Sequence, residues 1–155
     1  MLGRVSYAAA VTNVPRLTGP LKAARSIQVS INNAARSLLG VRASSHVWID
    51  ALLHKAGLPS LNGISVRAVA METWKCFASR DGSNGDRNPV GKILFGAQGG
   101  IRSTRSSTAG LIRSPLPKSV ATFVTSAAAI WNSSPQLRNA KTMREAHVVA
   151  KSLEK

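Results

Sequence analysis

The acidic residues of this sequence are too few and too widely spaced to form a catalytic pair. Two-metal phosphoryl transfer and glycoside hydrolysis both need two carboxylates held close together. No two acids here are adjacent, and two of them lie in a Gly-, Ser- and Asn-rich stretch that would not hold them in place. We therefore expect no polymerase, nuclease or glycosidase activity, and no enzyme activity from the chain by itself. The acids are Asp50, Glu72, Asp81, Asp86, Glu145 and Glu154.

The histidines and the cysteine give little support for a metal site. His46, Asp50 and His54 recur every four residues, so a helix would place them on one face, where they could bind a metal weakly. The same spacing also arises by chance on a solvated helix face, and we favour that interpretation. Cys76 is the only cysteine, which excludes a disulfide within the chain and a multi-cysteine zinc site. We predict no metal and no cofactor.

Basic residues dominate the charge of the sequence. Lys and Arg number 21 against 6 acids, which gives a formal net charge of +15 at pH 7. This surplus favours RNA or single-stranded DNA as a partner, because basic groups that neutralise phosphates release condensed counterions. The alternative is that the charge only keeps the chain soluble. The residues that we predict to contact nucleic acid are Lys22, Arg25, Arg36, Arg42, Arg102, Arg105 and Arg113.

Residues 22–39 have the apolar periodicity of a helix that would position the first of these basic residues. Apolar side chains at positions 24, 27, 31, 34, 35 and 38 fall on one face, and Gly40 supplies a stop. The same helical wheel places Lys22, Arg25 and Arg36 on a separate stripe. We therefore expect a helix that packs on one side and presents basic groups on another.

Two further helices are expected before residue 80. One covers 46–56 and follows a Ser44 or Ser45 cap. The other covers about 64–78 and is apolar on two faces, so it needs cover on two sides. Because the rest of the chain offers little to cover it, we predict a missing partner surface. The aromatic residues that we expect to dock on that partner are Trp74, Phe77 and Trp131.

Residues 80–118 form a stretch rich in Gly, Ser, Asn and Arg, interrupted only by a short apolar run at 93–95. Structureless loops of this length are uncommon within compact domains, so we interpret the stretch as a flexible basic linker. After it, Ser119 is a candidate N-cap for one helix. Thr142 and Glu145 have the spacing of a capping box, which predicts a last helix beginning there.

Three stretches together resemble one family, the non-LTR (LINE-type) retrotransposon reverse transcriptases, in the region after their polymerase core. The sequence IQVSINNAARSLLG at 27–40 is similar to the helix that opens this region. LLHKAGLPSL at 52–61 resembles a step between helices in the same proteins. AAIWNSSP at 128–135, followed by Leu137 and Arg138, resembles the motif that ends the region. The resemblance implies a helical element beside the polymerase thumb that contacts template RNA or packs on the reverse transcriptase core.

The match to the family pattern has departures. Ser134 stands where the family usually has an apolar residue before the proline. The chain also has no YxDD-like pair, no endonuclease residues and no Cys/His knuckle. The polymerase activity of the family is therefore not expected of this chain.

These observations predict an all-α chain with two small helical clusters joined by a flexible basic Gly/Ser-rich linker. We expect an irregular N-terminal arm at 1–20, a three-helix cluster at 21–79, the linker at 80–118 and a C-terminal helical pair at 119–155. The expected function is non-catalytic nucleic-acid binding in the nucleus or cytoplasm. No apolar run approaches the length of a membrane span, so we expect no membrane partner.

Two other functions remain open at this point. The chain could be a helical piece that docks on a larger protein, such as a reverse transcriptase core, without independent activity. It could also be a basic mitochondrial protein associated with the ribosome. The second alternative is motivated by the first 49 residues, which contain basic residues but no acid, as a presequence does.

Overall fold

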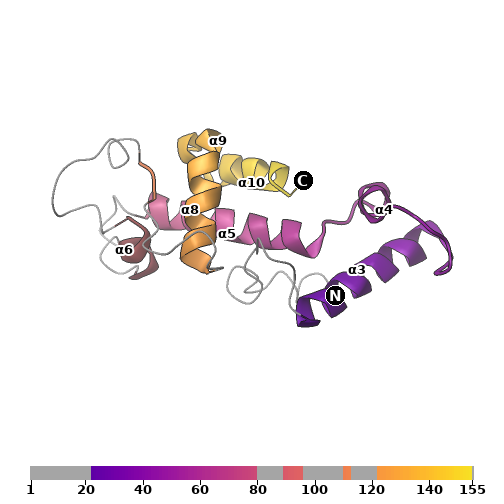
Figure 1. Ribbon diagram of the computed structural model, residues 1–155. Coiled ribbons are helices and arrows are strands. Elements are labelled where there is room, and N and C mark those ends of the chain that lie inside the picture. The colour runs from indigo at the N-terminus through magenta and orange to yellow at the C-terminus, as the bar shows by residue number, and fades with distance from the viewer. Residues whose placement is uncertain (1–21, 80–88, 96–109, 113–121, 155) are drawn as a thin grey trace.

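The computed structural model describes residues 22–79, 89–95, 110–112 and 122–154, and every regular element in these ranges is an α-helix (Figure 1). The all-α prediction is therefore confirmed. Among the described helices, none is long and apolar enough to cross a membrane. The helices in chain order are α3 (Lys22–Leu39), α4 (Ile49–Ala56), α5 (Leu61–Ala78), α6 (Pro89–Phe95), α8 (Phe123–Ser133), α9 (Pro135–Asn139) and α10 (Met143–Ser152).

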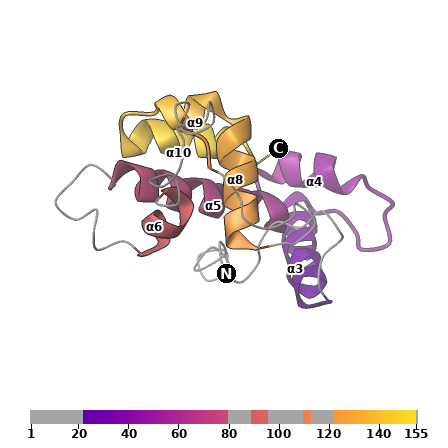
Figure 2. The ribbon, with the colours of Figure 1, turned by 60° about the vertical axis from the view of Figure 1, so that its left-hand side comes forward.

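Helix α5 is the central element of the fold. Figures 1 and 2 show α8 crossing it and α10 lying beside it, while α3 and α4 lie toward its N-terminal end. One apolar core joins α3, α4 and the start of α5 around Ile31, Leu52 and Ile64. A second core joins the rest of α5 to α6, α8, α9 and α10 around Val69 and Trp131. Both faces of this two-sided apolar helix are thus covered by the chain itself, which corrects the prediction of a missing partner surface.

The boundary between the two cores lies inside α5. Ala68, near the middle of this helix, packs against both cores. Residues 21–79 were expected to form one cluster by themselves, but the second half of α5 packs with the C-terminal helices instead. The two apolar cores therefore do not divide at a linker after residue 79, as the sequence predicted, but within α5.

The N-terminal helices follow the predicted pattern in part. Helix α3 has the predicted bounds, although Leu38, which the periodicity placed on the buried face, is 68% exposed. Helix α4 begins at Ile49 rather than at residue 46, and its N-cap is Trp48, which makes no side-chain capping bond. The Ser44 or Ser45 cap was therefore wrong. Gly57 ends α4 with a φ of 66°, a conformation that glycine adopts without the steric cost of a side chain.

Helix α5 begins three residues earlier than the sequence pattern predicted. The Ser60 hydroxyl caps it by accepting a hydrogen bond from the Gly63 amide at 3.0 Å. The Leu61 amide donates to Gln28 Oε1 of α3 at 2.7 Å. Because the first amides of a helix have no partner within the helix, these two acceptors fix where α5 starts.

The C-terminal helices begin at side-chain caps. Thr122 and Thr125 form reciprocal hydrogen bonds at the start of α8, whereas the predicted cap Ser119 lies outside the described residues. The predicted Thr142 cap of α10 is confirmed, because its hydroxyl accepts from the Glu145 amide at 3.2 Å. The Glu145 carboxylate accepts in turn from the amide of Lys141 at 2.9 Å, one residue before the cap.

Two described segments lie within the stretch predicted to be a flexible linker. Helix α6 buries Leu94 and Phe95 in the second core, and Ile112 is only 3% exposed in the same core. The prediction of a linker without packed elements was therefore wrong for 89–95 and 110–112. The remaining residues of 80–118 lie outside the described ranges.

Candidate nucleic-acid interface

The three aromatic residues expected to dock on a partner pack inside this chain instead. Trp131 is fully buried, and its ring centroid lies 4.9 Å from that of Phe77 and 5.6 Å from that of Phe95. Trp74 is 7% exposed, and its Nε1 donates to the carbonyl of Ala140 at 3.0 Å. Phe77 is half-buried and packs against the same core, so the apolar area of both tryptophans and part of that of Phe77 are covered within the chain. This corrects the prediction that they form an open docking face.

The motif that ends the resemblance forms a structural clasp on residues 110–112. Trp131 Nε1 donates to the carbonyl of Gly110 at 2.8 Å. The Asn132 side chain accepts from the Ile112 amide at 3.0 Å and donates to its carbonyl at 2.9 Å. Arg138 donates to the carbonyls of Trp131 and Asn132 at 2.7 and 2.9 Å, at the end of α8 where helical carbonyls lack partners. These side chains therefore hold residues 110–112 and the end of α8 together.

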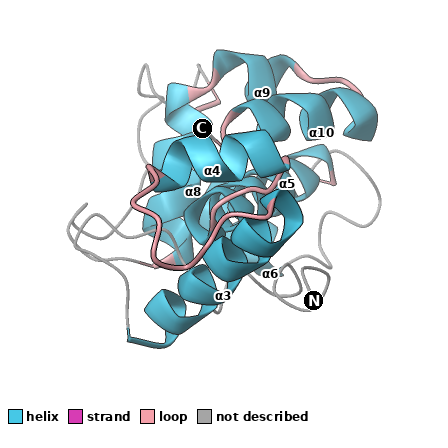
Figure 3. Ribbon diagram, turned by 90° about the vertical axis from the view of Figure 1, so that its right-hand side faces the viewer, coloured by secondary structure: helices cyan, strands magenta, loops and turns pink. Residues whose placement is uncertain are grey.

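The basic residues of α3 and the following loop take two different roles. Arg25 and Arg42 are exposed. Arg36 is half-buried, and its Nη1 donates to the carbonyls of Arg42 and Ser45 at 2.9 and 3.1 Å. Arg36 therefore fixes the loop between α3 and α4, which is drawn in pink in Figure 3. The sequence predicted that Arg36 contacts phosphates, whereas the structure shows that it positions the loop.

This loop borders an open hollow of about 590 Å³ on the surface. Its lining consists of Arg36, Ala43, Ser44, Ser45, His46, Val47 and Trp48. An adjoining hollow of about 340 Å³ is lined by Arg36 and Arg42 among others, so Arg36 borders both. We call Arg36, Arg42, His46 and Trp48 the α3–α4 loop site.

Trp48 is the residue of this site that the sequence did not single out. Its side chain is 76% exposed, the largest exposure among the exposed large hydrophobic residues of the described chain. Trp48 lies four residues before Leu52, so in a helix over 46–56 it would belong to the buried face. The later start of α4 places it before the helix, where its ring faces solvent. The sequence feature that could have identified Trp48 is its place in the basic, Ser-rich stretch RASSHVW at 42–48.

The loop site lies in a part of the chain with little negative charge. Residues 22–49 contain no acid, and the nearest acid along the chain is the exposed Asp50 in the first turn of α4. By contrast, Arg67 pairs with Glu154 at 3.1 Å and Lys75 pairs with Glu72 at 2.7 Å. The exposed basic groups of α3 and its loop are therefore better placed to attract an anion than those two paired residues.

The other predicted site residues cannot be placed around this site. Arg102, Arg105 and Arg113 lie outside the described residues, as does the side chain of Lys22. His46 precedes α4, so the helical stacking of His46, Asp50 and His54 does not occur. Within the described ranges, no group of three or more His, Cys, Asp or Glu residues could hold a metal ion.

The chain matches no protein-family model, no curated protein and no solved structure. Helix α3 carries the exposed Arg25, and the loop after it combines the exposed Arg42 and Trp48 with two backbone carbonyls that Arg36 holds.

Proposed function

We propose that this chain is a non-catalytic nucleic-acid-binding module, with RNA or single-stranded DNA as its partner. The observation that carries the proposal is the net charge of +15, combined with the absence of any acid before Asp50. Positive groups gathered in this way bind phosphates mainly through counterion release, without reading the base sequence. The resemblance to the region after the polymerase core of non-LTR reverse transcriptases supports an RNA partner.

Three arginines of helix α3 and its loop form a basic edge for such a partner. Arg25 and Arg36 are eleven residues apart, which corresponds to about three helical turns and a rise of about 16 Å along one side of the helix. Arg42 extends this edge into the loop, where its backbone carbonyl is held by Arg36. A phosphate backbone lying along this edge would contact Arg25 and Arg42 directly, because both side chains are exposed.

A salt titration with charge-matched variants tests the proposal. The test variant carries Arg25→Gln and Arg42→Gln, which remove two exposed charges but keep the Arg36 bonds to the loop. The control variant carries Lys141→Gln and Arg144→Gln, which remove two exposed charges at the start of α10. Both variants should keep the helix content of the chain by circular dichroism. Gln is almost as good a helix former as Arg at positions 25 and 144, and positions 42 and 141 lie outside the helices.

Affinity for a single-stranded RNA should fall steeply as salt is raised. In the test variant the slope of log affinity against log salt should fall by about one unit, or slightly less, for each lost phosphate contact. The control variant should keep a slope close to that of the unmodified chain. Equal losses in both variants would place the binding surface elsewhere, and a flat slope for the unmodified chain would overturn the proposal itself.

A further inference from the structure

We infer that the α3–α4 loop site holds an unpaired base against the indole of Trp48, so that the chain selects single-stranded over double-stranded nucleic acid. This inference rests on the proposed nucleic-acid binding and assigns a base-stacking role to a residue outside the basic edge. It concerns the loop that carries Arg42 and that Arg36 of α3 borders.

The exposure of Trp48 is built into the packing of its neighbours. Val47 and Ile49 both pack against the core formed by α3, α4 and the start of α5. The Trp48 backbone is in turn held by α4, because its carbonyl accepts from the Leu52 amide at 3.0 Å. With both neighbours turned toward the core, the indole between them points into solvent and is 76% exposed. The ring is therefore presented from a fixed backbone.

The other two tryptophans show how unusual this placement is within the chain. Trp74 and Trp131 are 7% and 0% exposed, and each donates its indole N–H to a backbone carbonyl. Leaving a third indole in water forgoes the stabilisation that burial of such a large apolar ring would give. A ligand that covers the Trp48 ring would recover part of this stabilisation.

The surrounding charge favours a nucleic-acid base over an apolar protein surface as that ligand. Arg36 and His46 line the hollow beside Trp48, and Arg42 lies on the adjoining one. Residues 40–48 contain no acid, and the nearest acid along the chain is Asp50, in the first turn of α4, which would repel a phosphate placed near it. A nucleotide would therefore place its base on the indole and its phosphate toward Arg36 and Arg42. Aromatic rings flanked by basic groups are the usual platform for single strands.

Stacking on Trp48 requires a base whose flat face is free. Bases in a duplex are stacked on their neighbours, so they would have to be unpaired and unstacked before they could reach the indole. Every base has such a face, so the site should tolerate different sequences. The basic edge on α3 would bind both kinds of nucleic acid, whereas Trp48 would add affinity for single strands only.

Binding of a uridine decamer and of a duplex of equal length, at one fixed salt concentration, tests the inference. Trp48→Ala should weaken binding of the single strand about 5- to 100-fold and leave duplex binding unchanged. Trp48→Phe should retain most of the single-strand affinity, because it keeps an aromatic face. Leu38→Ala is the control for lost apolar surface, since Leu38 is 68% exposed on α3, and it should change neither affinity. An unchanged thermal unfolding midpoint would show that each variant is folded.

Fluorescence provides an independent readout. Trp48 is the exposed indole among the three tryptophans, so the decamer should quench the emission of the unmodified chain and not that of Trp48→Phe. Equal losses of single-strand and duplex affinity in Trp48→Ala, or no loss in either, would overturn the stacking role while leaving the proposed function intact. Absence of binding by the unmodified chain to both probes would overturn both proposals.

Discussion

Asn132 holds the backbone of Ile112 with both polar atoms of its side-chain amide. Its Oδ1 accepts from the Ile112 amide at 3.0 Å, and its Nδ2 donates to the Ile112 carbonyl at 2.9 Å. The side-chain amide thus satisfies both the N–H and the C=O of one residue, as a neighbouring strand does in a β-sheet. It ties a segment 20 residues earlier in the chain to the end of α8 and positions the buried Ile112 side chain in the second core.

The first prediction concerns this clasp. Asn132→Ala removes both hydrogen bonds and should lower the free energy of unfolding by about 1–3 kcal/mol. Asn132→Asp keeps the acceptor and loses the donor, so its carboxylate would face the Ile112 carbonyl and should also destabilise the chain. Urea denaturation measures both effects. Asn139→Ala, an exposed asparagine at the end of α9, is the matched control and should change stability little. Equal effects at both asparagines would contradict a specific role for the clasp.

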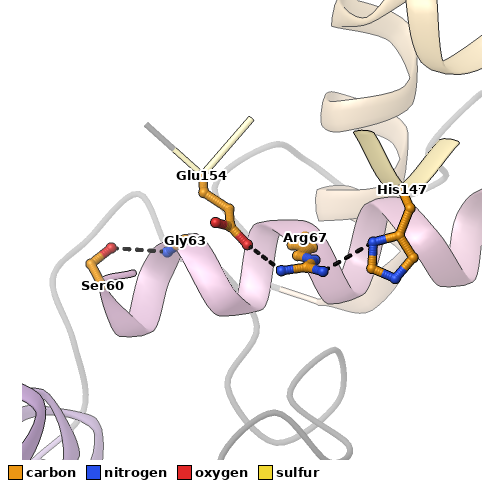
Figure 4. A network of polar contacts seen from close by, with 5 residues as sticks. All are labelled: Ser60, Gly63, Arg67, His147 and Glu154. Atoms are coloured by element: carbon orange, nitrogen blue, oxygen red, sulfur yellow. Dashed lines mark hydrogen bonds and ion pairs between the residues drawn. The ribbon is translucent and has the colours of Figure 1, made fainter. Parts of the chain in front are cut away.

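The second prediction concerns the close approach of Gly63 to the C-terminal turn, part of the network in Figure 4. A Cβ atom at Gly63 would lie 2.8 Å from the Glu154 carbonyl oxygen and 3.2 Å from its Cβ. Gly63→Ala should therefore lower the free energy of unfolding by about 1–3 kcal/mol, the usual effect of overpacking. This loss is expected even though alanine at an exposed position inside a helix is about 1 kcal/mol more stable than glycine.

A truncated background separates the clash from other effects of Gly63→Ala. Removing residues 153–155 eliminates the Glu154 contacts, together with the ion pair between Arg67 and Glu154. In that background Gly63→Ala should be neutral or slightly stabilising in thermal unfolding, because the helix preference of alanine remains and only the 3.3 Å contact with Ser60 Oγ opposes it. If the substitution is equally costly with and without these residues, contact with Glu154 is not the cause.

The third prediction concerns the start of α5. Gln28 Oε1 accepts from the Leu61 amide, and Gln28 Nε2 donates to Asn32 Oδ1 at 2.8 Å within α3. Gln28→Ala removes the acceptor, so the Leu61 amide should exchange its hydrogen faster. The expected loss of stability is about 1 kcal/mol, typical of one hydrogen bond. Ser60→Ala serves as a comparison, because it should speed exchange at Gly63 rather than at Leu61. Unchanged exchange at Leu61 in Gln28→Ala would contradict this contact.

The fourth prediction concerns Arg36 as a positioning residue. Arg36→Gln removes the guanidinium that donates to the carbonyls of Arg42 and Ser45, so the loop before α4 should become more mobile. In a chain with Trp74→Phe, which leaves Trp48 and the fully buried Trp131, the tryptophan fluorescence anisotropy should fall, because Trp48 follows the loop that Arg36 holds and Trp131 does not. Arg25→Gln in the same background removes the same charge from an exposed position on α3 and should leave the anisotropy unchanged. A fall of equal size in both variants would indicate a general effect of charge.

The sequence by itself determined the features that depend on neighbours a few residues apart. The bounds of α3 follow from its apolar periodicity and from Gly40, and the start of α10 follows from the Thr142 cap. Arg25 is exposed, as expected for the basic stripe of α3, whereas Arg36 of the same stripe is half-buried. Helical periodicity and caps arise from bonds within one or two turns, so they can be recognised without the rest of the fold.

Only the tertiary structure decided which aromatic residue is available to a ligand. Trp74 and Trp131 were expected to dock on a partner, yet their indoles bond to Ala140 and Gly110, which are 66 and 21 residues away along the chain. Trp48 was compatible with a buried helix face, yet α4 starts after it and leaves it exposed. An apolar helix face in the sequence shows only that some other surface must cover it. What covers it depends on contacts between distant segments, and local spacing carries no information about them.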